Sequence, residues 1–399
     1  MVATIEHQKV EVETVDDERA LERLASEWND LLDNSDQRVF FLRPFWLSLW
    51  WEILKPARAR LNVIVCRDCT GRLIGLAPLY IHQRRTLGVP HVRNLMFLGT
   101  GVYAQTSEYL DIIARRGWES DVARAVWTRL LGQSNWDRLL LCEIPSESRV
   151  LAHLQNQLRE AASTSACNRS HHIDTTVHWD EFVDSLSRST RKHLKRQTRR
   201  FEEKYRCRFR RVQNDDELES ALDALVFLHQ ARWRSKGQPG SFAISGFENL
   251  VRRGGRAALS EGRLRLWTLE LDDKIAAVRL AVIDGGIVHA IQGGFDPAYT
   301  RDSLGSVMLG MCIKDCIDDP EVIAYDFMGG TDAYKDWWTS LGRQTVTLSY
   351  LRPGFRSSVY SRLSTAIHLA RTALKRIVPL SIRKALYEKL VIWRHHRKF

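Results

Sequence analysis

The chain has 399 residues, of which 44% are hydrophobic and 27% charged, and its formal net charge is +11 at pH 7. This composition excludes a disordered protein, and the length favours two domains over one. No apolar run is long enough to cross a bilayer, and the N-terminus lacks the basic and apolar segments of a signal peptide. We therefore expect a cytosolic protein.

The seven cysteines are an odd number scattered along the chain, which fits reduced thiols better than a disulfide framework. Two pairs, Cys66 with Cys69 and Cys312 with Cys316, have spacings that zinc ligands also use. However, Cys66 lies in an apolar strand pattern, and the second pair lies one turn apart on a predicted helix. We interpret them as core cysteines and predict no metal.

The positive charge is concentrated in two segments. Residues 188–211 contain twelve Lys or Arg and two acids, and residues 355–399 contain eleven and one, so each segment carries +10. The rest of the chain is therefore acidic, at about −9. Two basic segments on an acidic body indicate an anionic partner without identifying it.

The first half of the chain predicts helices and strands in alternation. Its expected helices cover residues 15–35, 45–54, 119–131 and 146–160, and its expected strands cover residues 61–66, 73–81, 92–98, 109–114 and 139–144. The strands on either side of Thr70 and Gly71 are expected to form a hairpin.

The second half has a similar order. A long basic helix over residues 180–205 precedes a strand at 208–212 and a helix at 215–236. Three strands follow between Leu264 and Phe295, then a glycine-containing loop, a helix, the strand VIAYDFM and a last strand ending at Tyr350. This repeated order suggests a duplicated α/β unit.

Beyond Pro353 and Gly354 the pattern changes to two basic amphipathic helices within residues 355–399. Three alternatives remain open for them: packing on the body of the protein, lying on an anionic membrane surface, or docking on a partner. Aromatic residues suited to base stacking are sparse in both basic segments, so we do not expect sequence-specific nucleic-acid binding.

The run GGFDPAY…SLGSVML…YDFMGGTDAYKDWW resembles the CelD-like family of GNAT acyltransferases, relatives of the FemABX peptidyltransferases. The upstream SLSRSTRKHLKRQTRRFEE and LHQARWRSKG, and FFLRPFWLSLWWE in the first half, are similar to the lead-in segments of that family. The resemblance implies an α/β fold of two tandem GNAT-like domains with mixed central sheets. The domains would cover residues 1–165 and 170–352, followed by the helical tail at 355–399.

The resemblance also implies N-acyl transfer from acyl-CoA, most simply acetyl-CoA, to an amine. The acceptor would belong to exopolysaccharide, cellulose or envelope synthesis. An aminoacyl-tRNA donor, as in FemABX proteins, is an alternative. A second alternative is a non-catalytic scaffold that contacts a synthase, or the inner face of the membrane, through the basic helices.

The loop before the last long helix is the predicted acyl-donor site. Exposed backbone N–H groups at a helix start suit a phosphate group. The oxyanion needs a backbone donor, which this fold would place on the strand before the loop. The predicted cofactor-binding residues are Gln292, Gly293, Arg301, Asp302, Ser303, Leu304, Gly305 and Ser306.

Three residues are candidates for the chemistry. A carboxylate inside a buried strand, Asp326, is paired or has a raised pKa suited to a base. Lys335 follows an aromatic residue, as the substrate-facing lysine of FemABX proteins does, and His289 is an alternative base. Only one of His289 and Gln292 is expected to face the cleft. The predicted substrate-binding residues are Arg279, Tyr334, Asp332 and Trp337.

Overall fold

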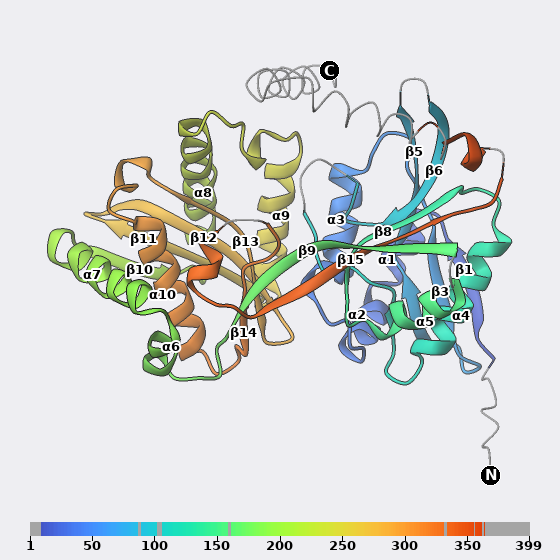
Figure 1. Ribbon diagram of the computed structural model, residues 1–399, viewed down its shortest axis with the longest axis horizontal. Helices are drawn as coiled ribbons and strands as arrows, with labels where there is room; N and C mark the ends of the chain where they lie inside the picture. Colours follow the sequence, from blue (N-terminus) through green and yellow to red (C-terminus); the bar gives the residue numbers. More distant parts are fainter. Residues whose placement is uncertain are drawn as a thin grey trace, which may run out of the picture.

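The computed structural model describes residues 9–86, 89–101, 106–158, 161–330, 333–354, 356–360 and 363. Two α/β halves lie side by side, and long strands run from one half to the other (Figure 1). In this described part of the chain the strands form an eleven-stranded sheet and a four-stranded sheet. The architecture is two tandem GNAT-like domains with mixed sheets, as the sequence predicts.

The first half follows the predicted order, with one added strand at its start. Its strands are β1 (Glu11–Val15), β2 (Arg60–Leu61), β3 (Val63–Arg67), β4 (Leu73–Ala77), β5 (Leu79–Thr86), β6 (Val89–Phe97), β7 (Ile113–Ala114) and β8 (Arg138–Pro145). Its helices are α1 (Glu18–Arg23), α2 (Ala25–Asp33), α3 (Pro44–Leu54), α4 (Glu119–Gly132) and α5 (Arg149–Leu158). Proline at the first position of α3 suits a helix start, because its missing N–H would have no partner there.

The second half carries the candidate site. Its strands are β9 (Ala162–Asp174), β10 (Cys207–Arg211), β11 (Leu264–Leu271), β12 (Lys274–Asp284), β13 (Ile287–Phe295), β14 (Ala324–Asp326) and β15 (Gly342–Leu351). Its helices are α6 (Trp179–Ser185), α7 (Arg188–Lys204), α8 (Asp215–Ser235), α9 (Phe247–Ser260) and α10 (Leu304–Asp318). The 3₁₀ turn η5 (Lys335–Trp337) follows β14, and the 3₁₀ turn η1 (Phe40–Leu42) precedes α3 in the first half.

Strands β9 and β15 join the two halves. The large sheet has the order β10-β11-β12-β13-β14-β9-β15-β8-β6-β5-β2, so β15 lies between β9 and the first-half strand β8. One end of β9 pairs with β14 and the rest pairs with β15. The division near residues 165–170 stays a prediction, and the backbone there is the continuous strand β9.

Several sequence predictions were wrong in detail. The helix expected over 180–205 is two helices, because Leu186 is extended and the Ser187 hydroxyl accepts a hydrogen bond from the Thr190 amide, which starts α7. The strand expected over 109–114 is reduced to β7, since Tyr109 has a positive φ of 56°. Strands β1 and β9 and helix α9 were not predicted.

Two hydrophobic cores lie on opposite faces of the second-half sheet. The first core fills the first half and continues between that half and α8 and α9. The second core lies under α6, α7 and α10. Cys66 belongs to the first core, and Cys312 and Cys316 belong to the second, which confirms the interpretation of these three as core cysteines. For Cys69 that interpretation was wrong, because it lies in the exposed turn between β3 and β4.

A buried ion pair connects the two halves. Arg43, just before α3, donates from Nε to Asp284 Oδ2 at 2.6 Å and from Nη2 to Oδ1 at 2.9 Å, and its side chain is 1% exposed. Asp284 ends β12, and its side chain is fully buried.

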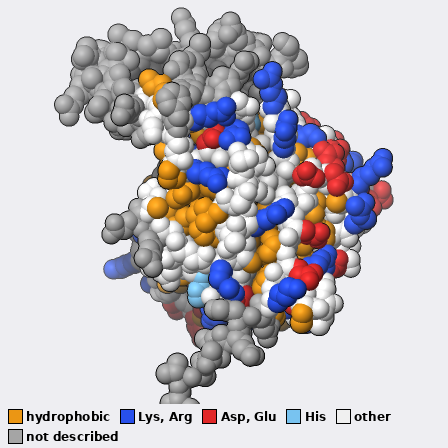
Figure 2. Space-filling view, turned by 90° about the vertical axis from the view of Figure 1, so that its right-hand side faces the viewer, with side chains coloured by type: hydrophobic (Ala, Val, Ile, Leu, Met, Phe, Trp, Pro, Cys, Tyr) orange, Lys and Arg blue, Asp and Glu red, His pale blue; other side chains and the backbone are white. Residues whose placement is uncertain are grey.

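On the outer surface of the first half the charged side chains are exposed instead, and cations and acids alternate there (Figure 2). No helix in the described ranges is long and apolar enough to cross a membrane. The predicted tail helices at 355–399 lie almost entirely outside those ranges.

Candidate active site

The second-half sheet opens between β13 and β14. These strands pair in parallel at three positions, from Ile287 with Ala324 to His289 with Asp326. Strand β13 then continues to Phe295 while β14 ends, so the later backbone of β13 has no β14 neighbour. A parallel pair that separates in this way leaves backbone donors and acceptors available to a ligand.

Helix α10 begins close to this opening. Ser303, at its start, has a φ of 63° and makes no side-chain cap. The amides of Ser306 and Val307 bond to the Ser303 carbonyl, so Leu304 and Gly305 supply the remaining first-turn amides. A Cβ on Gly305 would lie 3.0 Å from the ring of Phe295, so glycine allows the helix to approach β13 closely.

The side chains of the loop are turned to different partners. Asp302 forms an ion pair with Arg200 of α7 at 3.1 Å, whereas Arg301 is exposed. The predicted phosphate site therefore consists mainly of backbone amides, with Arg301 as its nearest cation in sequence.

A β-bulge lies on β13 beside the opening. Ala290 pairs with Ala281, but Gln292 pairs with Leu280, so Ile291 is the extra residue. His289 pairs with Val282, and Val282 and Leu280 belong to the same core. Since paired residues share a face, His289 and Gln292 both face that side. The expectation that only one of them could do so was wrong, because the bulge shifts the alternation.

Arg279 and Gly293 lie together on the other face. They are paired across β12 and β13, and a Cβ on Gly293 would contact the Arg279 side chain at 3.4 Å. The Arg279 Nε donates to the Tyr325 hydroxyl at 3.0 Å. Among the described residues Arg279 makes no ion pair with an acid, so an anionic ligand could bind here.

Buried polar groups from both halves meet at the end of β14. The Tyr109 hydroxyl donates to Asp326 Oδ2 at 2.7 Å and contacts the Ser170 hydroxyl. The Met328 amide donates to Asp326 Oδ1 at 2.6 Å. Asp326 is thus held by Tyr109 of the first half and by its own loop, and Ser170 of β9 contacts Tyr109. We call Tyr109, Ser170 and Asp326 the junction network.

Glu108 and Lys335 extend this network. The Gly329 amide donates to Glu108 Oε2 at 2.7 Å. The Lys335 ammonium, 2% exposed, donates to the carbonyls of Met328 and Gly329 at 2.8 and 2.7 Å. Lys335 therefore fixes the loop that follows β14, where Met328 has a positive φ of 61°. Non-glycine residues in this region are strained by about 1–3 kcal/mol and concentrate at functional sites.

His289 is the third candidate for the chemistry. Its ring is 1% exposed, and neither nitrogen has a hydrogen-bond partner among the described residues. Burial lowers its pKa to about 4, so the ring is neutral at pH 7. It lines a cavity of about 280 Å³ between the halves, together with Tyr109, Asp111 and Arg343.

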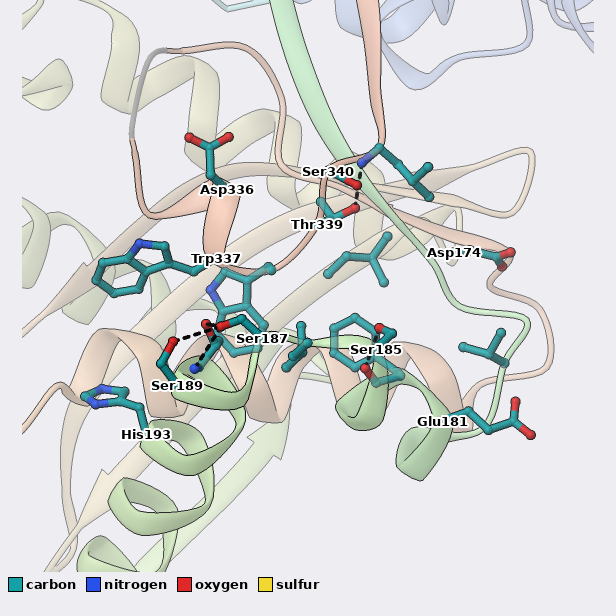
Figure 3. Close-up of a pocket in the computed structure, with 17 residues that line it drawn as sticks. Asp174, Glu181, Ser185, Ser187, Ser189, His193, Asp336, Trp337, Thr339 and Ser340 are labelled. Atoms are coloured by element: carbon teal, nitrogen blue, oxygen red, sulfur yellow. Dashed lines mark hydrogen bonds between the residues drawn. The ribbon is translucent and has the colours of Figure 1, made fainter.

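The predicted substrate-binding residues are not all together. Tyr334 lies near the Phe327 ring and close to Arg279. Trp337 is 55% exposed and lines a separate groove beside α6 and α7 (Figure 3). Asp332 lies outside the described residues. No group of His, Cys, Asp or Glu in the described ranges has the arrangement of a metal site.

Comparison with known proteins identifies the segment that contains this opening. Residues 188–336 match the family described as an acetyltransferase (GNAT) domain. The matched segment lies within the second half of the chain. This match includes β13, α10 and β14 and ends one residue after Lys335. No curated protein matches the chain.

Solved structures extend the likeness over both halves. The crystal structure of FemX aligns at 11% identity with a TM-score of 0.57, covering 88% of this chain and 99% of FemX. A conserved protein of unknown function from Bacteroides thetaiotaomicron aligns at 10% identity and a TM-score of 0.54, covering 85% and 100%. A tandem GNAT protein from the clavulanic acid pathway aligns at 14% and 0.48, covering 86% and 100%. At these identities the first two likenesses show the fold.

Sequence reasoning missed the residues that the first half contributes to the candidate site. Glu108 and Tyr109 come from the segment TSEYLDII, in which the predicted strand begins only at Tyr109. The available signal was an acid within a mostly apolar run, which indicates a buried and partnered carboxyl. Ser170, on the unpredicted strand β9, had no comparable signal.

The junction network predicts a loss of stability at high pH. Burial raises the pKa of Glu108 from an ordinary 4.5 to about 8 and that of Asp326 to about 6. Between the unfolded and folded pKa values of Glu108 the folded chain holds the extra proton, so stability falls as pH rises through this window. From pH 7 to 9 the free energy of unfolding should fall by about 1–2 kcal/mol more in the parent chain than in Glu108→Gln.

Urea unfolding at pH 7, 8 and 9 measures this difference. Buried neutral histidines such as His289, with a pKa of about 4, affect stability only at lower pH. Equal pH slopes for the parent chain and Glu108→Gln would show that Glu108 is ionised in the folded state at pH 7.

Proposed function

We propose that the protein is an N-acyltransferase that transfers an acyl group, most simply acetyl, from acyl-CoA to an amine. The observation that carries this proposal is the separation of β13 from β14 beside the start of α10. It occurs inside the segment that matches a GNAT acetyltransferase domain. The thioester would lie along the unpaired backbone of β13, and the phosphates would lie at α10.

Each part of the donor then has a proposed partner. The amides of Leu304 and Gly305, with Arg301, would hold the phosphates. Arg279, unpaired with any acid in the described ranges, would hold a further anionic group of the donor or substrate. The bulge beside Gln292 would present a backbone N–H to the developing oxyanion.

Two residues are proposed to handle the proton. Burial raises the pKa of Asp326 to about 6, close to the range that suits a base at neutral pH. His289 is neutral and lines the inter-half cavity, and neither of its ring nitrogens has a hydrogen-bond partner among the described residues. The amine would lose its proton to one of these two groups while Lys335 holds the loop after β14. Both oxygens of Asp326 already accept hydrogen bonds, from Tyr109 and from Met328. The ring nitrogens of His289 have no such partner among the described residues, but its pKa of about 4 makes it the weaker base at pH 7.

The resemblance to the CelD-like group supports an acceptor from exopolysaccharide, cellulose or envelope synthesis. The likeness to FemX concerns the fold, and an aminoacyl-tRNA donor remains the alternative within the same reaction class. A scaffold without activity is the alternative from another class. Binding of acyl-CoA separates the main proposal from both.

A thermal-shift experiment with acetyl-CoA, longer acyl-CoAs and free CoA tests the donor. A ligand that binds only the folded chain stabilises it by about 2.7 kcal/mol at 100 times its Kd, so we expect the Tm to rise by several degrees. Gly305→Ala should reduce the shift, because its Cβ would lie 3.0 Å from Phe295. Gly255→Ala in α9 is the matched control, since its Cβ would meet only ordinary contacts at 3.9 Å. No shift with any of these ligands at millimolar concentration would contradict acyl-CoA as the donor.

A further inference from the structure

A large groove lies on the second half, on the side of α6, α7 and α10. It has a volume of about 900 Å³ and runs between helices α6 and α7 on one side and residues 336–341 on the other (Figure 3). Its walls are largely apolar, with Ile173, Phe182, Leu186 and Trp338 among them. The proposed transfer reaction does not use this groove.

Two exposed apolar side chains stand at the groove. Among the described residues five large hydrophobic side chains are conspicuously exposed, and Trp337 at 55% and Leu341 at 51% both line this one groove. Exposure of half of a tryptophan and half of a leucine side chain to water costs free energy in proportion to the apolar area exposed. An apolar patch next to a groove is typical of a surface that binds a partner or a membrane.

Helix α7 continues the groove as a basic stripe. Ser189 and His193 line the groove, and Arg196 follows three residues after His193 on the same helical face. Lys192 lies beside this line, one residue before His193. Among the described residues no acid forms an ion pair with Arg188, Lys192, Lys195 or Arg196, all of which are exposed.

The charge is distributed unevenly along the groove. Trp337, His193 and Ser189 lie toward one end of the close-up, with Asp336 above them, and the two acids Glu181 and Asp174 lie toward the other end (Figure 3). Asp336 is paired with His171 at 2.9 Å. This separation differs from the outer face of the first half, where cations and acids alternate (Figure 2). A ligand with an apolar part and an anionic head would therefore be oriented, with its head toward α7 and away from the two acids.

We propose that this face binds anionic phospholipid at a membrane surface, with an acyl chain in the groove and the headgroup phosphate on α7. Trp337 suits the boundary between headgroups and chains, because its ring has an apolar body and a polar N–H. Unpaired lysines and arginines beside the groove attract an anionic leaflet. Single-stranded nucleic acid fits less well, since it would need several aromatic platforms for stacking and Trp337 is the one exposed aromatic side chain lining the groove.

Vesicle cosedimentation with the full chain tests the proposal. The parent chain should bind vesicles of phosphatidylglycerol and phosphatidylcholine, and bind pure phosphatidylcholine far less. Trp337→Ser with Leu341→Ser should weaken binding at least about tenfold through lost apolar burial. Reversing three cations (Lys192→Glu, Lys195→Glu and Arg196→Glu) should weaken it on the order of 100-fold, as each basic residue near an anionic surface contributes severalfold.

Matched variants separate this face from the rest of the chain, including its basic tail. Phe227→Ser with Leu131→Ser removes two exposed apolar side chains elsewhere, and Arg19→Glu, Arg23→Glu and Arg72→Glu change the net charge equally on the first half. Both controls should bind like the parent chain, and circular dichroism checks that all variants are folded.

Three results would overturn the proposal. The parent chain could fail to bind anionic vesicles, or bind neutral ones equally well. The groove variants could bind as the controls do. The third result concerns bulk tRNA, whose binding is assayed in parallel. If reversal of the α7 cations abolished tRNA binding and left vesicle binding unchanged, the basic stripe would be assigned to nucleic acid.

Discussion

Alanine at Asp284 is expected to lower the free energy of unfolding by about 3–5 kcal/mol. The carboxylate is completely buried and takes two hydrogen bonds from Arg43, at 2.6 and 2.9 Å. Arg38 and Arg263 also reach it, at 3.1 and 2.9 Å. Removing Asp284 leaves the buried Arg43 guanidinium without this partner at the contact between the two halves, which is far more unfavourable than losing an exposed pair.

Urea unfolding of Asp284→Ala measures this effect, and Glu52→Ala is its control. Glu52 pairs with Arg253 of α9 at 2.6 Å across the same contact between halves, but both side chains are exposed. Loss of such a pair changes stability by less than about 1 kcal/mol. If the two variants were equally stable, the buried pair would contribute no more than a surface one.

The contribution of the Arg43–Asp284 pair to stability depends on pH with the opposite sign to that of Glu108. Burial alone would raise the pKa of Asp284, but hydrogen bonds and charge from Arg43 outweigh it, so the pKa is lowered. The folded chain therefore binds fewer protons than the unfolded chain just below pH 4, and stability from Asp284 is lost as pH falls through its folded pKa. Asp284→Ala should accordingly be less sensitive to acid than the parent chain.

The sequence was most informative where burial alone decides the structure. Strands β11, β12 and β13 read as nearly continuous apolar runs, because both faces of the second-half sheet are covered by core. Their order, and the loop before α10, could be predicted for this reason. The tandem GNAT-like fold followed from the motifs in that stretch and from the repeated order of elements.

Strand β9 could not be predicted by the same signal. Its sequence ASTSACNRSHHID is mostly polar and half exposed, and it is held between β14 and β15 by backbone pairing. β15, which begins 168 positions after the end of β9, supplies most of its partners. Such long-range pairing overrides local propensity, so the joining of the two halves by β9 and β15 is visible only in the structure.

The candidate site likewise contains residues that the sequence could predict and residues that it could not. Asp326 and His289 stood out because polar residues in apolar strands need partners, and Lys335 stood out through the resemblance to FemABX proteins. The residues that contact them could not be identified from the sequence, because Tyr109, for example, lies 217 positions from Asp326. The bulge that turns His289 and Gln292 to one face was also hidden, since the sequence GGF after Gln292 does not specify where the register shifts.

Methionine at Lys335 is expected to reduce acyl transfer on the order of 100-fold in kcat/KM while leaving the chain folded. The Lys335 ammonium donates to two backbone carbonyls, those of Met328 and Gly329. These hold the strained loop at the point where β14 ends and β13 continues alone. Without the ammonium the loop can relax, and a displacement of about 1 Å at a reacting centre reduces rates by about 100-fold.

Steady-state kinetics with the donor identified by thermal shift, together with urea unfolding, separate function from stability for this lysine. Lys335→Arg should recover part of the rate, because a guanidinium can donate to both carbonyls. Lys314→Met is the control, since Lys314 pairs with Asp318 on the exposed side of α10 and should keep the parent rate. If Lys335→Met kept the parent rate as well, the loop after β14 would not position the reacting groups. If the rate fell only in proportion to the unfolded fraction, the role of Lys335 would be to stabilise the junction network and not to position the reacting groups.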